Sequence, residues 1–264
     1  MIGIIGAGIT GLVAAASLKK AGKKGSVFDS RPQEGGNIRT SKYGEYLLEL
    51  GPNSLVLNDE LYAFLDEWNL TQSIVHAKPE AKYRFVLKGG RYRKLPTGPV
   101  SLLRSRTFST KAKRALLKER KVPPQFAKGD SIDQFFRKRL GDEWTDYVVY
   151  PFVSGVFAGN PRELLIEKSF PRILKLEQEH SSLLRGMMAN RKSQQHRGTI
   201  SFTEGIQQLT DTLGAFLKPE LKLAHPLLAI RKGGKSYTLQ FKQGETEVDQ
   251  LILAIPAYQA ARLL

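Results

Sequence analysis

The chain begins with the run Ile2-Gly3-Ile4-Ile5-Gly6-Ala7-Gly8-Ile9-Thr10-Gly11, in which an apolar stretch leads directly into three closely spaced glycines. The apolar residues are typical of a short buried strand. The amphipathic sequence that follows Gly11 predicts a helix with Lys19 and Lys20 in its last turn and Gly22 as its terminator. In this arrangement Gly6 allows the tight turn, Gly8 lets a pyrophosphate approach the backbone, and Gly11 lets the helix pack closely on the strand. The free N–H groups at the helix start would then face the phosphates.

A second strand is predicted at residues 26–29, and it ends in an acid. Asp29 follows Gly6 by 23 residues, a spacing at which a carboxylate accepts hydrogen bonds from a ribose hydroxyl. An ordinary tight turn that binds nothing is the alternative, but it explains neither the three glycines nor the terminal acid. The sequence therefore predicts binding of an ADP moiety by the following residues: Gly6, Ala7, Gly8, Ile9, Thr10, Gly11 and Asp29.

Two further loops could complete this site. Residues 31–40 contain the pair Gly35-Gly36, followed by Asn37 and Arg39, where a nicotinamide-binding domain would normally continue into a helix. The glycines leave room for a ligand close to the backbone, and an arginine can pair with a phosphate. Residues 49–54 supply a second turn, with candidate ligand contacts at Gly51, Pro52, Asn53 and Ser54. The alternative is that both loops are simply exposed to solvent.

Composition excludes several classes of protein. The 264 residues are 41% hydrophobic and 25% charged, which is typical of a globular chain and not of a disordered one. Cysteine is absent, so a disulfide scaffold, a zinc–thiolate site, a cysteine nucleophile and a thioether-linked flavin are excluded, and a reducing compartment is favoured. The four histidines, at positions 76, 180, 196 and 225, lack metal-ligand spacing, so no metal is expected.

The positive charge is concentrated in one segment. The formal net charge is +16, and residues 78–128, which we call the basic segment, hold 16 Lys and Arg residues against only Glu80 and Glu119. Leucines are interleaved in its predicted helical stretch over residues 102–121, which favours a peripheral membrane surface with anionic lipids. A nucleic-acid surface is less favoured because no nucleic-acid motif accompanies the charge, and a solvated basic face remains the third alternative. No transmembrane helix is expected.

These residues resemble the flavin-dependent amine oxidase superfamily and, within it, the protoporphyrinogen and coproporphyrinogen oxidases of haem synthesis. The glycine run, Asp29, Gly35-Gly36 and Glu49-Leu50-Gly51-Pro52 look like the superfamily's FAD contacts. Further stretches look like the porphyrinogen oxidases: residues 83–85, 95–98, 130–136, 155–164, 201–206 and 251–257. Among these, Gly155-Val156-Phe157-Ala158-Gly159-Asn160 is the most specific.

The resemblance implies an enzyme that uses FAD to oxidise a porphyrinogen, with oxygen as the acceptor. It implies that Arg84 anchors a substrate carboxylate, that Phe157 and Gly159 line the substrate cavity, and that the backbone of Leu227 meets the adenine. A solvated arginine at position 84 and close helix packing at the glycines are the alternatives. No acid–base dyad is required, because the cofactor performs the redox chemistry. Rival functions are another amine oxidase or desaturase, and a non-catalytic flavin-binding fragment.

The expected fold is α/β, a Rossmann-like FAD/NAD(P)-binding domain with an inserted, mainly helical, substrate- and membrane-facing region. Residues 1–77 and 198–264 are assigned to the FAD-binding domain and residues 78–197 to the insertion. Asp29 and Glu204 depart from the glutamate and glycine common in these families. The chain is also shorter than such oxidases, so we expect an N-terminal portion or a truncated form. The expected location is the cytoplasm, on the inner face of the cell membrane.

Local patterns predict several further elements. Asn58 or Asp59 can cap a helix that continues to Trp68. Ser131 and Gln134 form a capping-box pattern at the start of a helix that ends at Gly141. Residues 237–241 are expected to pair with residues 248–255 across Gly244.

Overall fold

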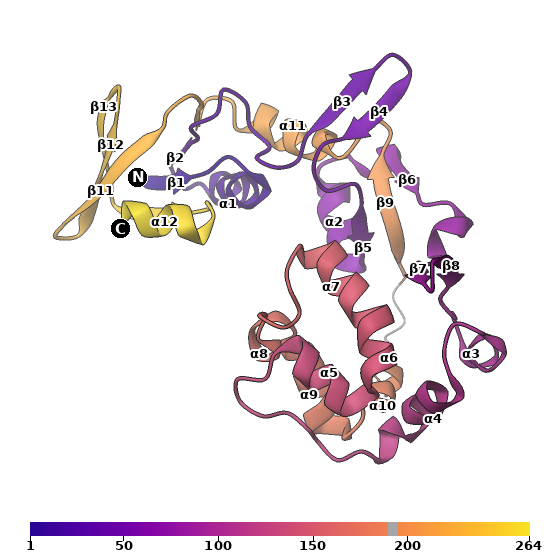
Figure 1. The fold of residues 1–264 in the computed structure, drawn as a ribbon. Coiled ribbons are helices and arrows are strands. Elements are labelled where there is room, and N and C mark those ends of the chain that lie inside the picture. Colours follow the sequence, from indigo (N-terminus) through magenta and orange to yellow (C-terminus); the bar gives the residue numbers. More distant parts are fainter. Residues whose placement is uncertain (190–194) are drawn as a thin grey trace. The chain divides into compact units, whose positions relative to one another are not determined.

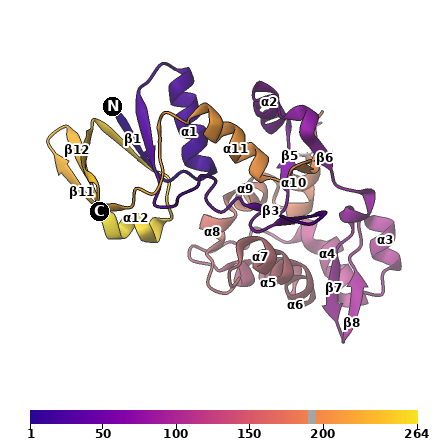
Figure 2. The same cartoon turned by 90° about the horizontal axis from the view of Figure 1, so that it is seen from above.

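The computed structural model describes residues 1–189 and 195–264 (Figures 1 and 2). The chain folds as two compact units, each described here by itself. The first unit comprises Met1–Ala77 and Gln194–Leu264, and the second comprises Lys78–Ser193. The region predicted at 78–197 therefore includes a short stretch, residues 190–194, that lies outside the described residues.

The first unit is built on a four-stranded sheet whose paired strands all run parallel. Its strands stand in the order β10 (Leu221–Lys222), β2 (Gly25–Phe28), β1 (Ile2–Ile5) and β14 (Gln250–Leu253). Helix α1 (Ile9–Lys20) connects β1 to β2, and α11 (Gln207–Phe216) packs with it against one side of the sheet. The fold class predicted from the glycine run is confirmed.

An antiparallel meander covers the other side of this sheet. It consists of β11 (Leu227–Gly233), β12 (Ser236–Phe241) and β13 (Gly244–Val248). Successive side chains of β1 point to opposite faces of the sheet. Ile4 therefore packs with the helices on one face, and Ile5 packs with Leu239 and Phe241 of the meander on the other. The pairing predicted between residues 237–241 and 248–255 is only partly correct. Val248 pairs with Tyr237, but the residues after it leave the meander and join β1 in the parallel sheet.

The rest of the first unit carries two smaller sheets and two helices. A hairpin joins β3 (Thr40–Tyr43) to β4 (Tyr46–Glu49), and β9 (Gly198–Phe202) lies between β5 (Leu55–Leu57) and β6 (Ile74–His76). Helix α2 (Asp59–Glu67) begins where the Asn58 side chain accepts the N–H of Leu61 at 2.7 Å, so Asn58 is the cap, one of the two residues predicted for this role. Helix α12 (Ala257–Leu263) follows the last parallel strand.

The second unit is mainly helical. A hairpin of β7 (Phe85–Lys88) and β8 (Arg91–Lys94) precedes eight α-helices among the described residues. These are α3 (Pro99–Arg104), α4 (Thr110–Lys118), α5 (Ile132–Leu140), α6 (Asp142–Trp144), α7 (Tyr150–Phe157), α8 (Ile166–Ser169), α9 (Pro171–His180) and α10 (Leu183–Ala189). The capping box of Ser131 and Gln134 and the end of α5 at Gly141 are both as predicted.

The helical stretch predicted over residues 102–121 is interrupted. Residues 105–109 separate α3 from α4, because Phe108 turns inward and stacks on Trp144 with ring centroids 3.9 Å apart. Leu102 and Leu116 pack in the same small core, whereas Leu103 and Leu117 are exposed. Burial of one aromatic ring outweighs the helical continuity that the sequence suggests.

A buried ion network joins four segments of the second unit. Arg139 of α5 donates to Glu119 at 2.7 Å and to Glu177 of α9 at 2.6 Å, and all three side chains are at most 1% exposed. Burial would raise the pKa of Glu119, but hydrogen bonds from Ser182, Leu183 N–H and Arg139 outweigh it and hold this pKa below its ordinary value. These hydrogen bonds favour the charged form of Glu119 and offset the cost of burying it.

Candidate functional site

A cleft of about 780 Å³ lies in the first unit, at the carboxyl ends of three parallel strands. Its walls come from the turn after β1, the end of β2, the loop at residues 35–38, the segment 225–227, and the residues from 254 to 263 that follow β14. Ligands of open α/β sheets bind at this edge, outside the carboxyl ends of the strands. The cleft is therefore the candidate site.

The glycines of the cleft allow backbone segments to approach more closely than side chains would permit. A Cβ atom on Gly11 would lie 1.9 Å from the carbonyl oxygen of Gly6, so glycine is required where α1 passes the first strand. Likewise a Cβ atom on Gly36 would lie 2.9 Å from the Cα of Gly8, and Gly35 N–H donates to the Ala7 carbonyl at 2.8 Å. The two predicted glycine loops are thus held against each other as a cradle of bare backbone.

The start of α1 is open toward this cradle. Gly8 is its N-cap with extended backbone angles, no side chain caps the first turn, and no acidic residue lies there. The last turn carries Lys19 and Lys20, which complement the opposite end of the helix dipole. The first-turn N–H groups of a helix have no intrahelical acceptor, so this end offers both donors and partial positive charge to an anion.

Asp29 holds the end of β2 against the turn after β1. Its carboxylate accepts the N–H of Ala7 at 2.7 Å and the N–H of Arg31 at 2.8 Å. A carboxylate has about four acceptor positions, so two remain for a ribose hydroxyl. Arg31 donates in turn to the Gly36 carbonyl at 2.5 Å, which ties the second glycine loop to the same corner.

Ten of the residues predicted to bind the cofactor line the cleft: Gly6, Gly8, Ile9, Thr10, Asp29, Gly35, Gly36, Asn37, Pro52 and Leu227. Six do not line it: Ala7, Gly11, Arg39, Gly51, Asn53 and Ser54. Three of these six shape the backbone instead, and Gly11, at the start of α1, has been described above. Ala7 N–H donates to Asp29, and Gly51 makes room for the Asn37 carbonyl, which a Cβ atom there would approach to 1.9 Å. Direct contact with a ligand remains a prediction for all sixteen.

Several residues that line the cleft were not predicted from the sequence, and those after β14 form a whole wall of it. Lining residues that were not predicted include Arg31, Ile38, Leu209, His225 and, after β14, Pro256, Tyr258, Gln259 and Arg262. The strand at residues 250–253 was expected to pair with the meander, so its carboxyl end was not placed beside the glycine turn. Assigning it to the parallel sheet would have placed the residues that follow it at the site.

The predicted substrate residues belong to the second unit and line neither this cleft nor the smaller cavity beside it. Arg84 is exposed and donates to the carbonyls of Ala81 and Tyr83. Phe157 ends α7, is 45% exposed, and packs edge-on against Phe170 at 5.0 Å. Gly159 lies beside Leu164, whose side-chain end a Cβ atom on the glycine would approach to 2.8 Å.

Apolar side chains protrude from the basic segment. Within the part of the chain that the structure describes, only Lys88 of its sixteen cations forms a salt bridge, to Glu143. The hydrogen bonds that Glu143 receives from Lys88 and Ser109 lower its pKa, although its burial acts in the opposite direction. The exposed apolar residues are Phe85, Leu87, Tyr92, Val100, Leu103 and Leu117, each at least 57% exposed. Cations and apolar side chains thus share one segment.

Residues 1–189 and 195–264 contain no group of three or more potential metal ligands, and no helix among them has the length and hydropathy needed to cross a membrane.

Known proteins resemble the chain over its whole length. A chloroplastic protoporphyrinogen oxidase of Nicotiana tabacum is 30% identical over 99% of this chain and 52% of that protein. A coproporphyrinogen III oxidase of Bacillus subtilis (strain 168) is 28% identical over 99% of this chain and 61% of that protein. A crystal structure from Exiguobacterium sp. 255-15, of a protein assigned to the protoporphyrinogen oxidases, matches 100% of this chain and 61% of its own, with a TM-score of 0.79 and 25% identity.

The chain thus spans about half to three fifths of the length of these relatives. Residues 9–264 match the profile of the flavin containing amine oxidoreductases. The chain therefore belongs to the flavin-containing amine oxidoreductase family.

Proposed function

We propose that the protein uses FAD to oxidise a porphyrinogen, protoporphyrinogen IX or coproporphyrinogen III, to the porphyrin in haem biosynthesis, with oxygen as the final acceptor. Membership of a flavin-containing family and relatives named for both porphyrinogen oxidations support this reaction. The observation that carries the choice of FAD is the cleft itself, where an uncapped helix start, two glycine loops and Asp29 meet.

The residues of the cleft fit a dinucleotide. The volume of about 780 Å³ lies in the range of sites that enclose large ligands. The backbone cradle of Gly8 and Gly36 would accommodate the pyrophosphate, and the N-terminal N–H groups of α1 would donate to it. Asp29 would accept from the ribose of the adenosine half. A mononucleotide would leave the Asp29 end of the cleft without a partner.

FAD bound in this cleft would supply the redox chemistry, namely acceptance of hydride equivalents from the porphyrinogen and reduction of oxygen to peroxide. The chain's own residues bind and orient. The glycine cradle and Asp29 hold the cofactor, and Ile5, Ile9 and Leu209 line the cleft with apolar surface that excludes water. No side chain is assigned as an acid or base catalyst.

The second unit is proposed to bind the substrate. A porphyrinogen carries propionate carboxylates, and the exposed guanidinium of Arg84 can donate a bidentate pair of hydrogen bonds to one of them. Phe157 and Gly159 are proposed to lie beside the macrocycle, and the exposed Phe157 ring supports this assignment.

We also propose a peripheral membrane surface on the basic segment, on the inner face of the cell membrane in the cytoplasm. Exposed apolar side chains among unpaired cations suit an anionic lipid interface, because the apolar groups enter the headgroup region while the cations meet lipid phosphates. The absence of cysteine is compatible with a reducing compartment.

The first experiment is an absorbance spectrum of the purified chain after incubation with FAD and desalting. A retained flavin band, followed by oxidation of protoporphyrinogen or coproporphyrinogen in an oxygen-dependent assay, is the expected result. The family also contains amine oxidases. Turnover of an amine but of neither porphyrinogen would replace the proposed substrate, and a folded chain that retains no flavin would contradict the cofactor assignment.

A further inference from the structure

Three cations of the basic segment gather around Tyr83, just before the β7–β8 hairpin begins. The ammonium of Lys94 lies 3.1 Å from the centroid of the Tyr83 ring, and the ammonium of Lys82 lies 5.1 Å from it. The guanidinium of Arg84 donates to the carbonyl of Tyr83 at 3.3 Å. The tyrosine is half-buried, whereas the three cationic residues are exposed. We call Lys82, Arg84 and Lys94 the Tyr83 cluster.

The hairpin holds these cations near one another. Lys94 is the register partner of Phe85, and the N–H of Leu95 donates to the Arg84 carbonyl at 2.8 Å. Arg84 also donates to the carbonyl of Ala81, so its guanidinium turns back toward the stretch that carries Lys82. Cation–π attraction to the Tyr83 ring orients the ammonium of Lys94. Cations from both ends of the hairpin are therefore presented beside one aromatic ring.

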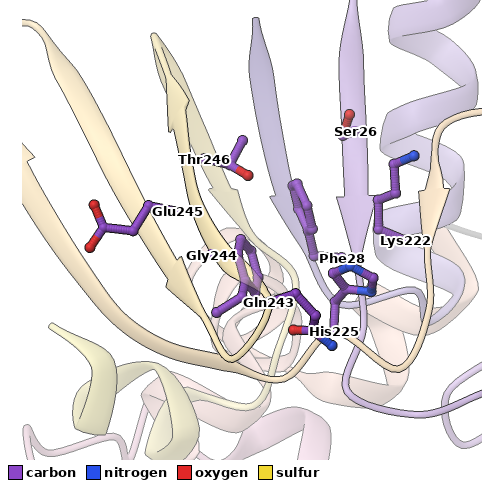
Figure 3. A pocket seen from close by; sticks show the side chains of 9 residues that line it. Ser26, Phe28, Lys222, His225, Gln243, Gly244, Glu245 and Thr246 are labelled. Atoms are coloured by element: carbon purple, nitrogen blue, oxygen red, sulfur yellow. The ribbon is translucent and has the colours of Figure 1, made fainter.

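The Tyr83 cluster differs in charge from the two cavities of the first unit. The cleft is lined by Asp29 as well as by two arginines. The smaller cavity, of about 220 Å³, is lined by Lys222 and Glu245, both labelled in Figure 3. By contrast, no cation of the Tyr83 cluster forms a salt bridge within residues 1–189 and 195–264. Like charges repel, so the cluster is stabilised by an anion that carries more than one negative charge.

We propose that the Tyr83 cluster binds two propionates of one porphyrinogen, the first on Arg84 and the second on Lys94. The inference rests on the proposed function, because it takes a porphyrinogen as the substrate and Arg84 as its anchor. The guanidinium offers a planar pair of donors, and the ammonium keeps donors that do not face the ring. A lipid headgroup gains little from a cation in a fixed position, whereas a rigid macrocycle gains affinity from one, so the ordered Lys94 favours the substrate.

Porphyrins that differ only in their carboxylates test this proposal. Protoporphyrin IX has two propionates, its monomethyl ester has one and its dimethyl ester has none, and fluorescence titration of the full chain at neutral pH and low salt measures their binding. Each esterification should weaken wild-type binding about three- to tenfold, because one ion pair is lost. Lys94→Met should bind the free acid and the monoester equally, both as the wild type binds the monoester. Lys94→Arg, which restores the charge, should recover both steps.

Lys111→Met is the matched control, because it removes the same charge from an exposed position of α4. It should bind all three porphyrins as the wild type does. The inference is wrong, and the proposed function stands, if the wild type binds by its carboxylates but Lys94→Met behaves like the control, or if Lys94→Met weakens the dimethyl ester as much as the free acid. Weaker pelleting of Lys94→Met with anionic vesicles but unchanged porphyrin binding would assign the cluster to lipid phosphate instead. If the wild type binds none of the three porphyrins, the proposed substrate fails, and the inference fails with it.

Discussion

The carboxylate of Asp29 accepts the backbone N–H of Ala7 at 2.7 Å, so the acid that ends β2 also fixes the glycine turn that follows β1. Its other oxygen accepts the N–H of Arg31 at 2.8 Å. One side chain therefore shapes the cradle and faces the cleft. An aspartate suits this double role because its short side chain keeps both oxygens close to the backbone of the turn.

We expect Asp29→Ala to impair both folding and binding. It leaves the partly buried N–H of Ala7 and the exposed N–H of Arg31 without their acceptor, and the loss at Ala7 should lower the free energy of unfolding by about 1–3 kcal/mol. Loss of the ribose partner should weaken ADP binding about tenfold. Thermal unfolding and calorimetry measure the two effects, with Asp66→Ala, an exposed aspartate of α2, as control. Unchanged ADP affinity in a folded Asp29→Ala chain would show that Asp29 does not bind the ribose.

Alanine substitutions at Gly8 and Gly11 should separate an effect on FAD binding from an effect on stability. A Cβ atom on Gly8 would meet no atom nearer than 3.9 Å, whereas one on Gly11 would lie 1.9 Å from a backbone oxygen. Because Gly8 lines the cleft, Gly8→Ala should keep the wild-type melting temperature and weaken FAD binding at least tenfold. Gly11→Ala should lower the free energy of unfolding by about 3 kcal/mol.

Gly233→Ala is the matched control for both variants, because nothing lies within 4 Å of the added atom and the backbone there is not left-handed. Equal loss of stability in Gly8→Ala and Gly11→Ala would contradict the cradle described here.

The buried network makes the second unit sensitive to loss of Arg139. Arg139→Met would leave the carboxylates of Glu119 and Glu177 buried without their guanidinium, at an expected cost of about 3–5 kcal/mol. Lys175→Met on α9 removes only an i,i+4 ion pair to Glu179 between exposed side chains, and it should cost at most about 0.5 kcal/mol. Thermal unfolding of the two variants should rank them in this order, and the reverse order would show that the network does not support the fold.

The same network predicts how stability depends on pH. The pKa of Glu119 is lowered in the folded chain, so its contribution is complete above the pKa of an unfolded glutamate and is lost as the pH falls through the folded value. The free energy of unfolding should therefore decrease on acidification below about pH 5. Urea titrations at several pH values should show that the free energy of unfolding falls less on acidification in Glu119→Gln than in the wild type. An equal fall in both proteins would contradict the lowered pKa.

The basic segment should bring the chain to anionic vesicles. Pelleting with vesicles that contain phosphatidylserine is expected at low ionic strength and should be lost at about 0.5 M salt, because screening weakens the attraction of unpaired cations. The double variant Leu87→Ser, Tyr92→Ser keeps every charge but removes two exposed apolar side chains, and it should bind more weakly. Absence of pelleting even at low salt would exclude the membrane surface and leave the solvated basic face.

Much of the site could be predicted from local sequence. The glycine run and the acid 23 residues later predicted the β1–α1–β2 unit, because Gly6 takes a positive φ at the turn and Gly11 passes close to the Gly6 carbonyl, both within that unit. The capping side chains of Asn58 and Ser131 likewise act on residues three positions away, so the starts of α2 and α5 followed from the sequence.

Contacts between distant residues were decided only by the tertiary structure. Gln250–Leu253 is a strand in either sheet, and it joins β1 because its apolar side chains are covered on both faces there. Phe108 breaks a helix to stack on Trp144, and Arg139 meets acids twenty and thirty-eight positions away. His225 reaches the end of β2 from almost two hundred residues along the chain. The sequence by itself thus determined the nucleotide fingerprint, whereas the packing of distant segments determined the walls around it.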